Sequence, residues 1–127
     1  MILKFRAYNP ATNDWYKPEE VFVSDGNIYL DDDDFDELIQ NNDVILMQST
    51  GKVDSTGKVE VFVGDILYYP DQDEVNYGII EFDEDKLAFV LDNGYEKFIY
   101  GDYGMDKVVG NIYQNRDLAD YILGGNQ

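Results

Sequence analysis

The chain of 127 residues contains no histidine and no cysteine. This absence excludes the Ser-His-Asp and Cys-His arrangements of nucleophilic catalysis, any disulfide framework and the usual zinc sites. Serine occurs only at positions 24, 49 and 55, and Thr50-Gly51-Lys52 lacks the preceding glycine and the spacing of a phosphate-binding loop. We therefore expect a protein that is not an enzyme and that uses no cofactor.

Basic residues are also scarce. Nine Lys and Arg stand against 27 Asp and Glu, for a formal charge of −18, and the only basic residues before Lys52 are Lys4, Arg6 and Lys17. Nucleic-acid binding normally depends on Lys and Arg that neutralise phosphates, and an anionic membrane repels the same average charge. We expect neither direct nucleic-acid binding nor membrane binding.

Long apolar runs are missing too, since none approaches roughly 18 residues. The N-terminal residues 1–6 show no apolar core and no small-residue cleavage site of a signal peptide. The absence of cysteine fits a reducing compartment. These features predict a soluble, cytoplasmic protein.

The apolar content is nevertheless that of a folded protein, with 44% hydrophobic and 15% aromatic residues. The length predicts a single domain over residues 1–127. The character of the sequence changes near residue 48, which leaves open a subdivision into an N-terminal β/α part at 1–47 and a barrel-like part at 48–127.

In the first part the sequence predicts strands joined by hairpins and one short helix. Residues 3–8 alternate in polarity as a half-buried strand does. Two apolar runs flank residues 24–27, where Gly26 and Asn27 tolerate the positive φ of a tight turn. Residues 31–34 precede Phe35, Leu38 and Ile39, whose i, i+3, i+4 spacing predicts a short amphipathic helix.

The second part reads as a series of short strands. About five of them fall between residues 59 and 113, with Asn93-Gly94 as the strongest hairpin signal. A closing helix around Leu118 and Ile122 would be capped by Asn115 and ended by Gly124. We expect an α+β, mostly β fold whose second part is a small SH3-like or bent-sheet barrel with a C-terminal helix.

The acidic residues gather in three runs that form our candidate protein-binding surface. Carboxylate oxygens are the ligands that Ca²⁺ and Mg²⁺ prefer. These runs lack the regular ligand and glycine spacing of a calcium loop, so we predict no metal site. The candidate residues are Asp31, Asp32, Asp33, Asp34, Asp36, Glu37, Asp71, Asp73, Glu74, Asp83, Glu84 and Asp85.

Several segments, taken in order, carry a family resemblance: Lys4-Phe5-Arg6-Ala7-Tyr8 with Trp15, Met47-Gln48-Ser49-Thr50-Gly51, Gly57-Lys58, Val63-Gly64-Asp65-Ile66, Gly78-Ile79-Ile80-Glu81-Phe82 and Val109-Gly110-Asn111-Ile112-Tyr113-Gln114-Asn115. Together they resemble the YopX-like proteins of phages and prophages of Gram-positive bacteria, over most of the chain. The resemblance implies a phage origin, expression in the cytoplasm of the bacterial host, a small α+β or mostly β fold and a homo-oligomer. It supplies no catalytic residues.

Two functions fit these observations. A dense array of carboxylates can imitate spaced phosphates, so the protein would bind and modulate or inhibit a basic host or phage protein that normally holds nucleic acid. Alternatively, edge strands and aromatic faces would build a homo-oligomer with a structural role, and the negative exterior would prevent aggregation. A small-ligand or metal-dependent activity is a third alternative.

Overall fold

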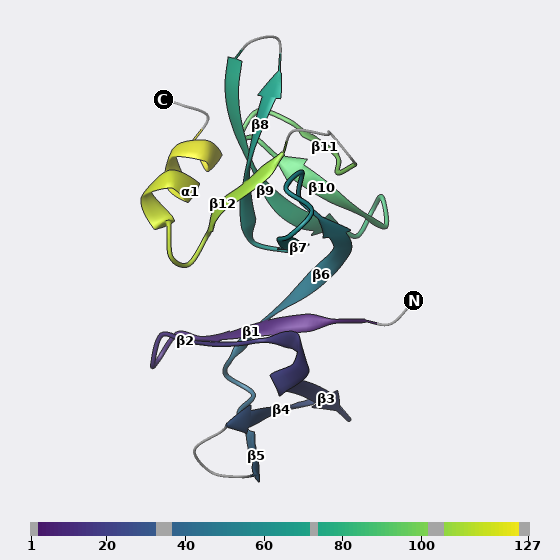
Figure 1. Cartoon of the computed structure of the whole chain (residues 1–127), viewed down its shortest axis with the longest axis vertical. Helices are drawn as coiled ribbons and strands as arrows, with labels where there is room; N and C mark the ends of the chain where they lie inside the picture. The colour runs from purple at the N-terminus through teal and green to yellow at the C-terminus, as the bar shows by residue number, and fades with distance from the viewer. Residues whose placement is uncertain (1–2, 33–36, 72–73, 102–105, 125–127) are drawn as a thin grey trace. The chain divides into compact units, whose positions relative to one another are not determined.

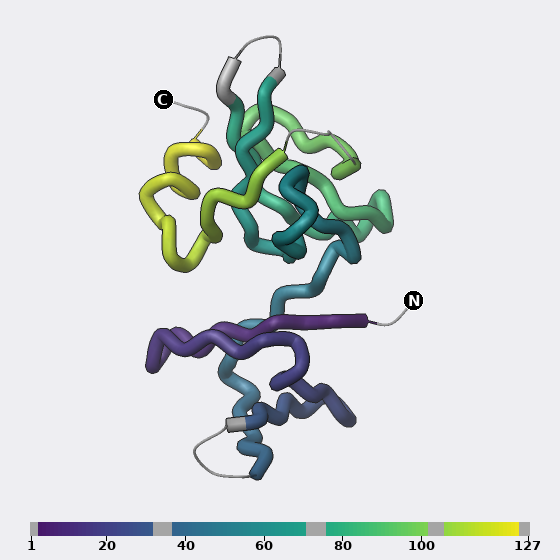
Figure 2. The backbone as a smooth tube through the Cα atoms, in the orientation of Figure 1, coloured from purple at the N-terminus to yellow at the C-terminus, as the bar shows by residue number. Residues whose placement is uncertain are grey.

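The computed structural model describes residues 3–32, 37–71, 74–101 and 106–124. These residues are mostly strand, with an α-helix near the C-terminus, which confirms the predicted α+β, mostly β class. The chain divides into two compact units, Met1–Ser49 and Thr50–Gln127. Figures 1 and 2 trace the chain through both units.

The N-terminal unit is built from short antiparallel strands. Strand β1 pairs with β2 on one side and with the first half of β6 on the other, while β4 lies between β3 and β5 in a separate three-stranded sheet. The elements are β1 (Phe5–Asn9), β2 (Asp14–Tyr16), the 3-10 helix η1 (Pro18–Glu20), β3 (Val21–Ser24), β4 (Asn27–Asp32), β5 (Glu37–Gln40) and β6 (Ile45–Val53).

The predicted hairpin at residues 24–27 is present, with a small shift in its turn. Positive φ occurs at Asp25 (52°) and Gly26 (80°), rather than at Gly26 and Asn27. Asn27 instead begins β4, where it pairs with Ser24. Two adjacent residues of positive φ suit the twist of the flanking strands, which explains the two-residue turn.

The short helix predicted around Phe35, Leu38 and Ile39 is wrong where the structure describes it. Residues 37–40 form strand β5, which pairs in register with β4. Leu38 is opposite Asp31 and Ile39 is opposite Leu30, so the two apolar side chains point to opposite faces of the sheet. A short apolar run fits either period, and pairing with β4 decides the conformation.

The C-terminal unit contains a five-stranded antiparallel sheet in the order β11-β10-β9-β8-β12, curled into a half-barrel (Figure 1). This confirms the predicted bent sheet of about five strands. The second half of β6 continues into this unit beside β7. The elements are β7 (Glu60–Phe62), β8 (Asp65–Asp71), β9 (Glu74–Asp83), β10 (Ala88–Asp92), β11 (Lys97–Ile99), β12 (Lys107–Asn111) and α1 (Arg116–Leu123).

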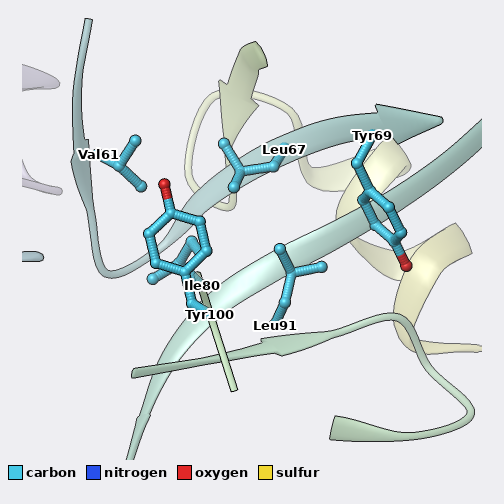
Figure 3. Close-up of a cluster of buried hydrophobic side chains, with 6 residues drawn as sticks. All are labelled: Val61, Leu67, Tyr69, Ile80, Leu91 and Tyr100. Carbon is cyan, nitrogen blue, oxygen red and sulfur yellow. The ribbon is translucent and has the colours of Figure 1, made fainter. Parts of the chain in front are cut away.

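The inner face of this sheet carries the core of the unit. Figure 3 shows Leu67 and Leu91 between the rings of Tyr100 and Tyr69, with Val61 and Ile80 near Tyr100. The Tyr69 ring meets Phe98 edge-on, with 5.9 Å between ring centroids. The buried residues of the cluster are Val61, Leu67, Tyr69, Ile80, Leu91 and Tyr100.

Helix α1 packs on the opposite face of the same sheet. Its Ala119 and Ile122 contact Ile66 and Ile79, which alternate along β8 and β9 with the core residues. Asn115 occupies the predicted N-cap position, but its side chain makes no cap hydrogen bond to α1. Its Oδ1 accepts a hydrogen bond from the Asn111 backbone N–H (3.0 Å), so the residue fastens β12 to the helix start.

Candidate binding surface

Four carboxylates of the C-terminal unit are buried, so they do not contribute to an acidic exterior. Their exposed fractions are 4% for Asp54, 1% for Asp65, 9% for Asp92 and 2% for Asp106. Three of them accept backbone N–H groups in tight turns: Asp65 from Phe62, Asp92 from Gly94 and Asp54 from Thr56. Hydrogen bonding of this kind makes burial of a carboxylate tolerable.

Asp54 shows how such a buried acid stays ionised. Desolvation by burial raises its pKa, but hydrogen bonds from the Thr56 hydroxyl and from backbone N–H groups outweigh that cost, and the pKa lies below its usual value. One of these donors is the Val108 N–H at 3.1 Å, on strand β12. Asp54 is therefore an ionised side chain that links the turn at residues 54–56 to strand β12.

A cavity of about 440 Å³ lies next to Asp54, between the end of β6 and the residues that follow β11. Its two carboxylates are hydrogen-bonded within the protein. Asp54 accepts the Val108 N–H, and Asp106 Oδ2 accepts a hydrogen bond from the Tyr100 hydroxyl at 3.3 Å. We interpret them as structural. The lining residues are Gly51, Lys52, Val53, Asp54, Ser55, Gly57, Tyr100, Gly101 and Asp106.

A second cluster of charge lies on the outer side of β9, β10 and β11. Glu81 is near Asp92, and its carboxylate Oε2 is 3.8 Å from the Lys97 Nζ. Burial, followed by the hydrogen bond and charge repulsion from Asp92, raises the pKa of Glu81, and Lys97 offsets part of that rise. The cluster therefore places two carboxylates, Glu81 and Asp92, close together beside the cation Lys97.

The segments that carry the family resemblance have structural explanations. A Cβ on Gly78 would overlap the Leu91 side chain, and a Cβ on Gly110 would overlap the side chain of Asn115. Gly64 has a φ of 92°, in the turn that brings Asp65 to the Phe62 N–H. These residues fix turns and close approaches of strands, so their roles are structural.

The predicted acidic residues fall into three separate places. Asp32 pairs with Glu37 at the end where β4 leads into β5, and Asp71 pairs with Glu74 at the end where β8 leads into β9. The third group begins at Asp83, the last residue of β9. The second and third groups lie at opposite ends of the ten-residue strand β9, up to roughly 30 Å apart. Asp33, Asp34, Asp36 and Asp73 lie outside the described residues.

One member of the third group is hydrogen-bonded within its own turn. Asp83 Oδ1 accepts the backbone N–H groups of Asp85 (2.9 Å) and Lys86 (3.1 Å). Glu84 and Asp85 are exposed, and Lys86 lies next to them in the same turn. A basic side chain thus accompanies the acids here.

The β4–β5 group has different surroundings. From residue 18 to residue 51 the sequence contains ten carboxylates and no Lys or Arg. Asp31 is half-buried and Glu37 is exposed. Strands β3, β4 and β5 therefore carry no cation of their own to neutralise their acids, which distinguishes this sheet from the β9–β10 turn.

The same sheet exposes large apolar side chains, which the sequence did not single out. Phe22 is paired with Tyr29, and Leu38 with Asp31, so all four side chains share one face, here called the outer face. Phe22 is 46% exposed and Leu38 is 51% exposed. The opposite face carries Leu30 into the core of the unit. The available signal was the apolar run of residues 21–23, but strand β5, which completes the sheet on the other side of β4, was predicted as helix.

In the ranges that the structure describes, no three Asp or Glu side chains are grouped so as to hold a metal ion. No helix in the same ranges is long and apolar enough to cross a membrane.

Residues 4–120 match the family model described as YopX protein. No curated protein is significantly similar to the chain.

Proposed function

The chain belongs to the YopX protein family, and from that premise we propose that it is a phage-encoded, non-catalytic binding protein that engages a basic host protein and modulates or inhibits it. The target would be a protein whose basic surface normally holds nucleic acid. Carboxylates on this chain would take the place of phosphates, and their long-range field would speed the encounter.

The observation that carries the proposal is the uncompensated acidity of residues 18–51, with ten carboxylates and no basic residue. Side chains of opposite charge close by would screen such a surface, as Lys86 does beside Glu84 and Asp85. The sheet of β3, β4 and β5 has no such neighbour within its own segment. It therefore supports selection of a positively charged partner.

The test is affinity capture of host proteins on the immobilised full chain, at about 50 mM and about 500 mM salt, because screening shortens the reach of exposed charges from roughly 14 Å to roughly 4 Å. We expect basic proteins to be retained at low salt and released at high salt. Recovery of the bait alone at low salt would contradict the proposal.

A matched pair of variants locates the effect. Glu19→Gln with Glu37→Gln and Asp43→Asn removes three exposed charges from the N-terminal unit, and Glu84→Gln with Asp85→Asn and Glu96→Gln removes three from the C-terminal unit. Both variants have the same net charge. We expect the first to lose capture and the second to retain it, whereas equal losses would indicate a general charge effect.

The alternative of a structural homo-oligomer has one supporting observation of its own. Large apolar side chains are exposed on the C-terminal unit, with Leu87 79% exposed and Tyr95 71% exposed. Such side chains favour contact between copies when they form a continuous patch. Static light scattering over a concentration series tests this, and a strict monomer would exclude the assembly function.

A further inference from the structure

The outer face of the β3–β4–β5 sheet combines exposed apolar side chains with the carboxylate of Asp31. Phe22 lies directly across from Tyr29, and Leu38 is diagonal to that tyrosine on the next strand, so the three side chains are neighbours on one surface. Asp31 lies beside Leu38 on the same face.

We propose that this outer face is the docking surface for a protein segment that presents an apolar side chain flanked by Lys or Arg. The inference rests on the proposed function and specifies its partner. Phe22, Tyr29 and Leu38 would receive the apolar side chain, while Asp31 on the same face would pair with a flanking cation. The uncompensated acidity of residues 18–51 would attract the other cations. Central apolar anchors with charged surroundings are the usual composition of a binding hot spot.

Charge complementarity decides against a second copy of this chain as the occupant. An isologous dimer through this face would bring the same residues of two copies together. Residues 18–51 contain only acidic charge, so acids would face acids across the interface. Like charges placed together across an interface disfavour association.

The acidic residues alone do not provide enough affinity for specific binding. Exposed ion pairs contribute little to affinity because water and salt screen them, so a partner of charge alone would bind weakly and without register. The apolar centre supplies contact area that is insensitive to salt. A basic amphipathic segment should therefore bind better than a purely basic one.

The experiment titrates the full chain, labelled with ¹⁵N, with two synthetic peptides of equal length and charge. One contains Lys and Leu with the leucines on one face, and the other contains Lys and Ser. We expect the Lys/Leu peptide to bind at least about 10-fold more tightly. We also expect its amide shift changes to cluster on Val21–Ser24, Asn27–Asp32 and Glu37–Gln40.

Two leucines of nearly equal exposure give a matched control. Leu38 is 51% exposed on the outer face, and Leu123 is 52% exposed at the end of α1. Leu38→Ser should weaken binding of the Lys/Leu peptide about 10-fold, while Leu123→Ser should leave it unchanged. Phe22→Thr, which keeps strand propensity, provides a second variant if Leu38→Ser unfolds the N-terminal unit.

The outcomes separate this inference from the proposed function. Equal binding of the two peptides, equal effects of the two leucine variants, or shift changes outside β3, β4 and β5 would overturn the docking surface, while salt-sensitive capture of basic host proteins would still support the proposed function. Failure of the Lys/Leu peptide to bind would also overturn it. Shift changes on the outer face that depend on protein concentration alone would identify a second copy as the occupant and contradict the assignment.

Discussion

Asp54 joins two parts of the C-terminal unit that are far apart in the sequence. Its Oδ1 accepts the Thr56 N–H at 3.0 Å, and its Oδ2 accepts the Val108 N–H at 3.1 Å. The side chain is 4% exposed, so water cannot replace these bonds. Asp54 therefore acts as a structural crosslink within an acidic sequence.

Replacement of Asp54 by Ala should destabilise the protein by about 1–3 kcal/mol, because two part-buried N–H donors lose their acceptor. Urea denaturation measures the loss. Ser55→Ala, at the exposed neighbour, is the control and should change stability by less than about 0.5 kcal/mol. A similar small change for Asp54→Ala would show that the crosslink contributes little.

The same carboxylate predicts a response to acid. Its pKa in the folded protein lies below the ordinary value of 3.8. A depressed pKa contributes stability that is present above the ordinary pKa and is lost as the pH falls through the folded-state pKa. The stability difference between the wild type and Asp54→Asn should therefore shrink below about pH 3.8, as measured by urea denaturation at several pH values.

Glu81 predicts the opposite dependence. Burial and Asp92 raise its pKa above the ordinary value of 4.5, so its contribution to stability is complete below that pH and is lost as the pH rises through the raised pKa. Glu81→Gln should gain stability relative to the wild type between pH 4.5 and pH 7.5. Glu84→Gln removes an exposed carboxylate nearby, and an equal gain for that variant would refute the assignment to Glu81.

The sequence alone did not separate structural acids from surface acids. Asp54, Asp65 and Asp92 each lie in a run with Gly, Ser, Thr or Asn, which is typical of side chains that bond to nearby backbone N–H groups. That signal predicts a turn but not burial. The burial of Asp54 also depends on Val108, and a partner 54 residues away is invisible to local sequence patterns.

At the scale of elements, close approach of strands fixes the identity of Gly78 on β9. A Cβ there would overlap the side chain of Leu91 on β10. Gly78→Ala should destabilise the protein by about 1–3 kcal/mol through overpacking. Gly101→Ala is the control, because a Cβ at that position meets no atom within 4 Å.

A double-mutant cycle with Leu91→Ala tests whether that overlap is the cause. Removal of the Leu91 side chain creates space for the new methyl group, so the cost of Gly78→Ala should be smaller in the Leu91→Ala background. Thermal denaturation of the four proteins measures the coupling. Strict additivity would show that the cost arises from the backbone and not from the contact.

The elements that the sequence predicted correctly have strong local signals. Asn93-Gly94 marks the β10–β11 hairpin, and Gly94 has a φ of 91°. Strand β5 has no such signal, since its four residues are held by pairing with β4. The outer face depends on that pairing, and for this reason the candidate docking surface could not be derived from the sequence while the curled sheet could.

At the scale of the whole molecule, charge repulsion remains even when the buried acids are set aside. Without Asp54, Asp65, Asp92 and Asp106, Asp and Glu still outnumber Lys and Arg by more than two to one. Self-repulsion among like charges destabilises a compact state, and salt screens it. The folded protein should therefore be most stable at high ionic strength.

We expect the melting temperature to rise by several degrees between about 10 mM and about 500 mM NaCl, since screening shortens the reach of charge from roughly 30 Å to roughly 4 Å. The rise should be smaller in the variant Glu19→Gln, Glu37→Gln, Asp43→Asn, which removes three exposed carboxylates from the unit where residues 18–51 carry no cation. Sodium sulfate would stabilise any protein by surface exclusion, so NaCl is the salt to use. A flat or falling melting temperature in NaCl would mean that the acids are already neutralised within the fold, and the electrostatic selection of a basic partner would lose its physical basis.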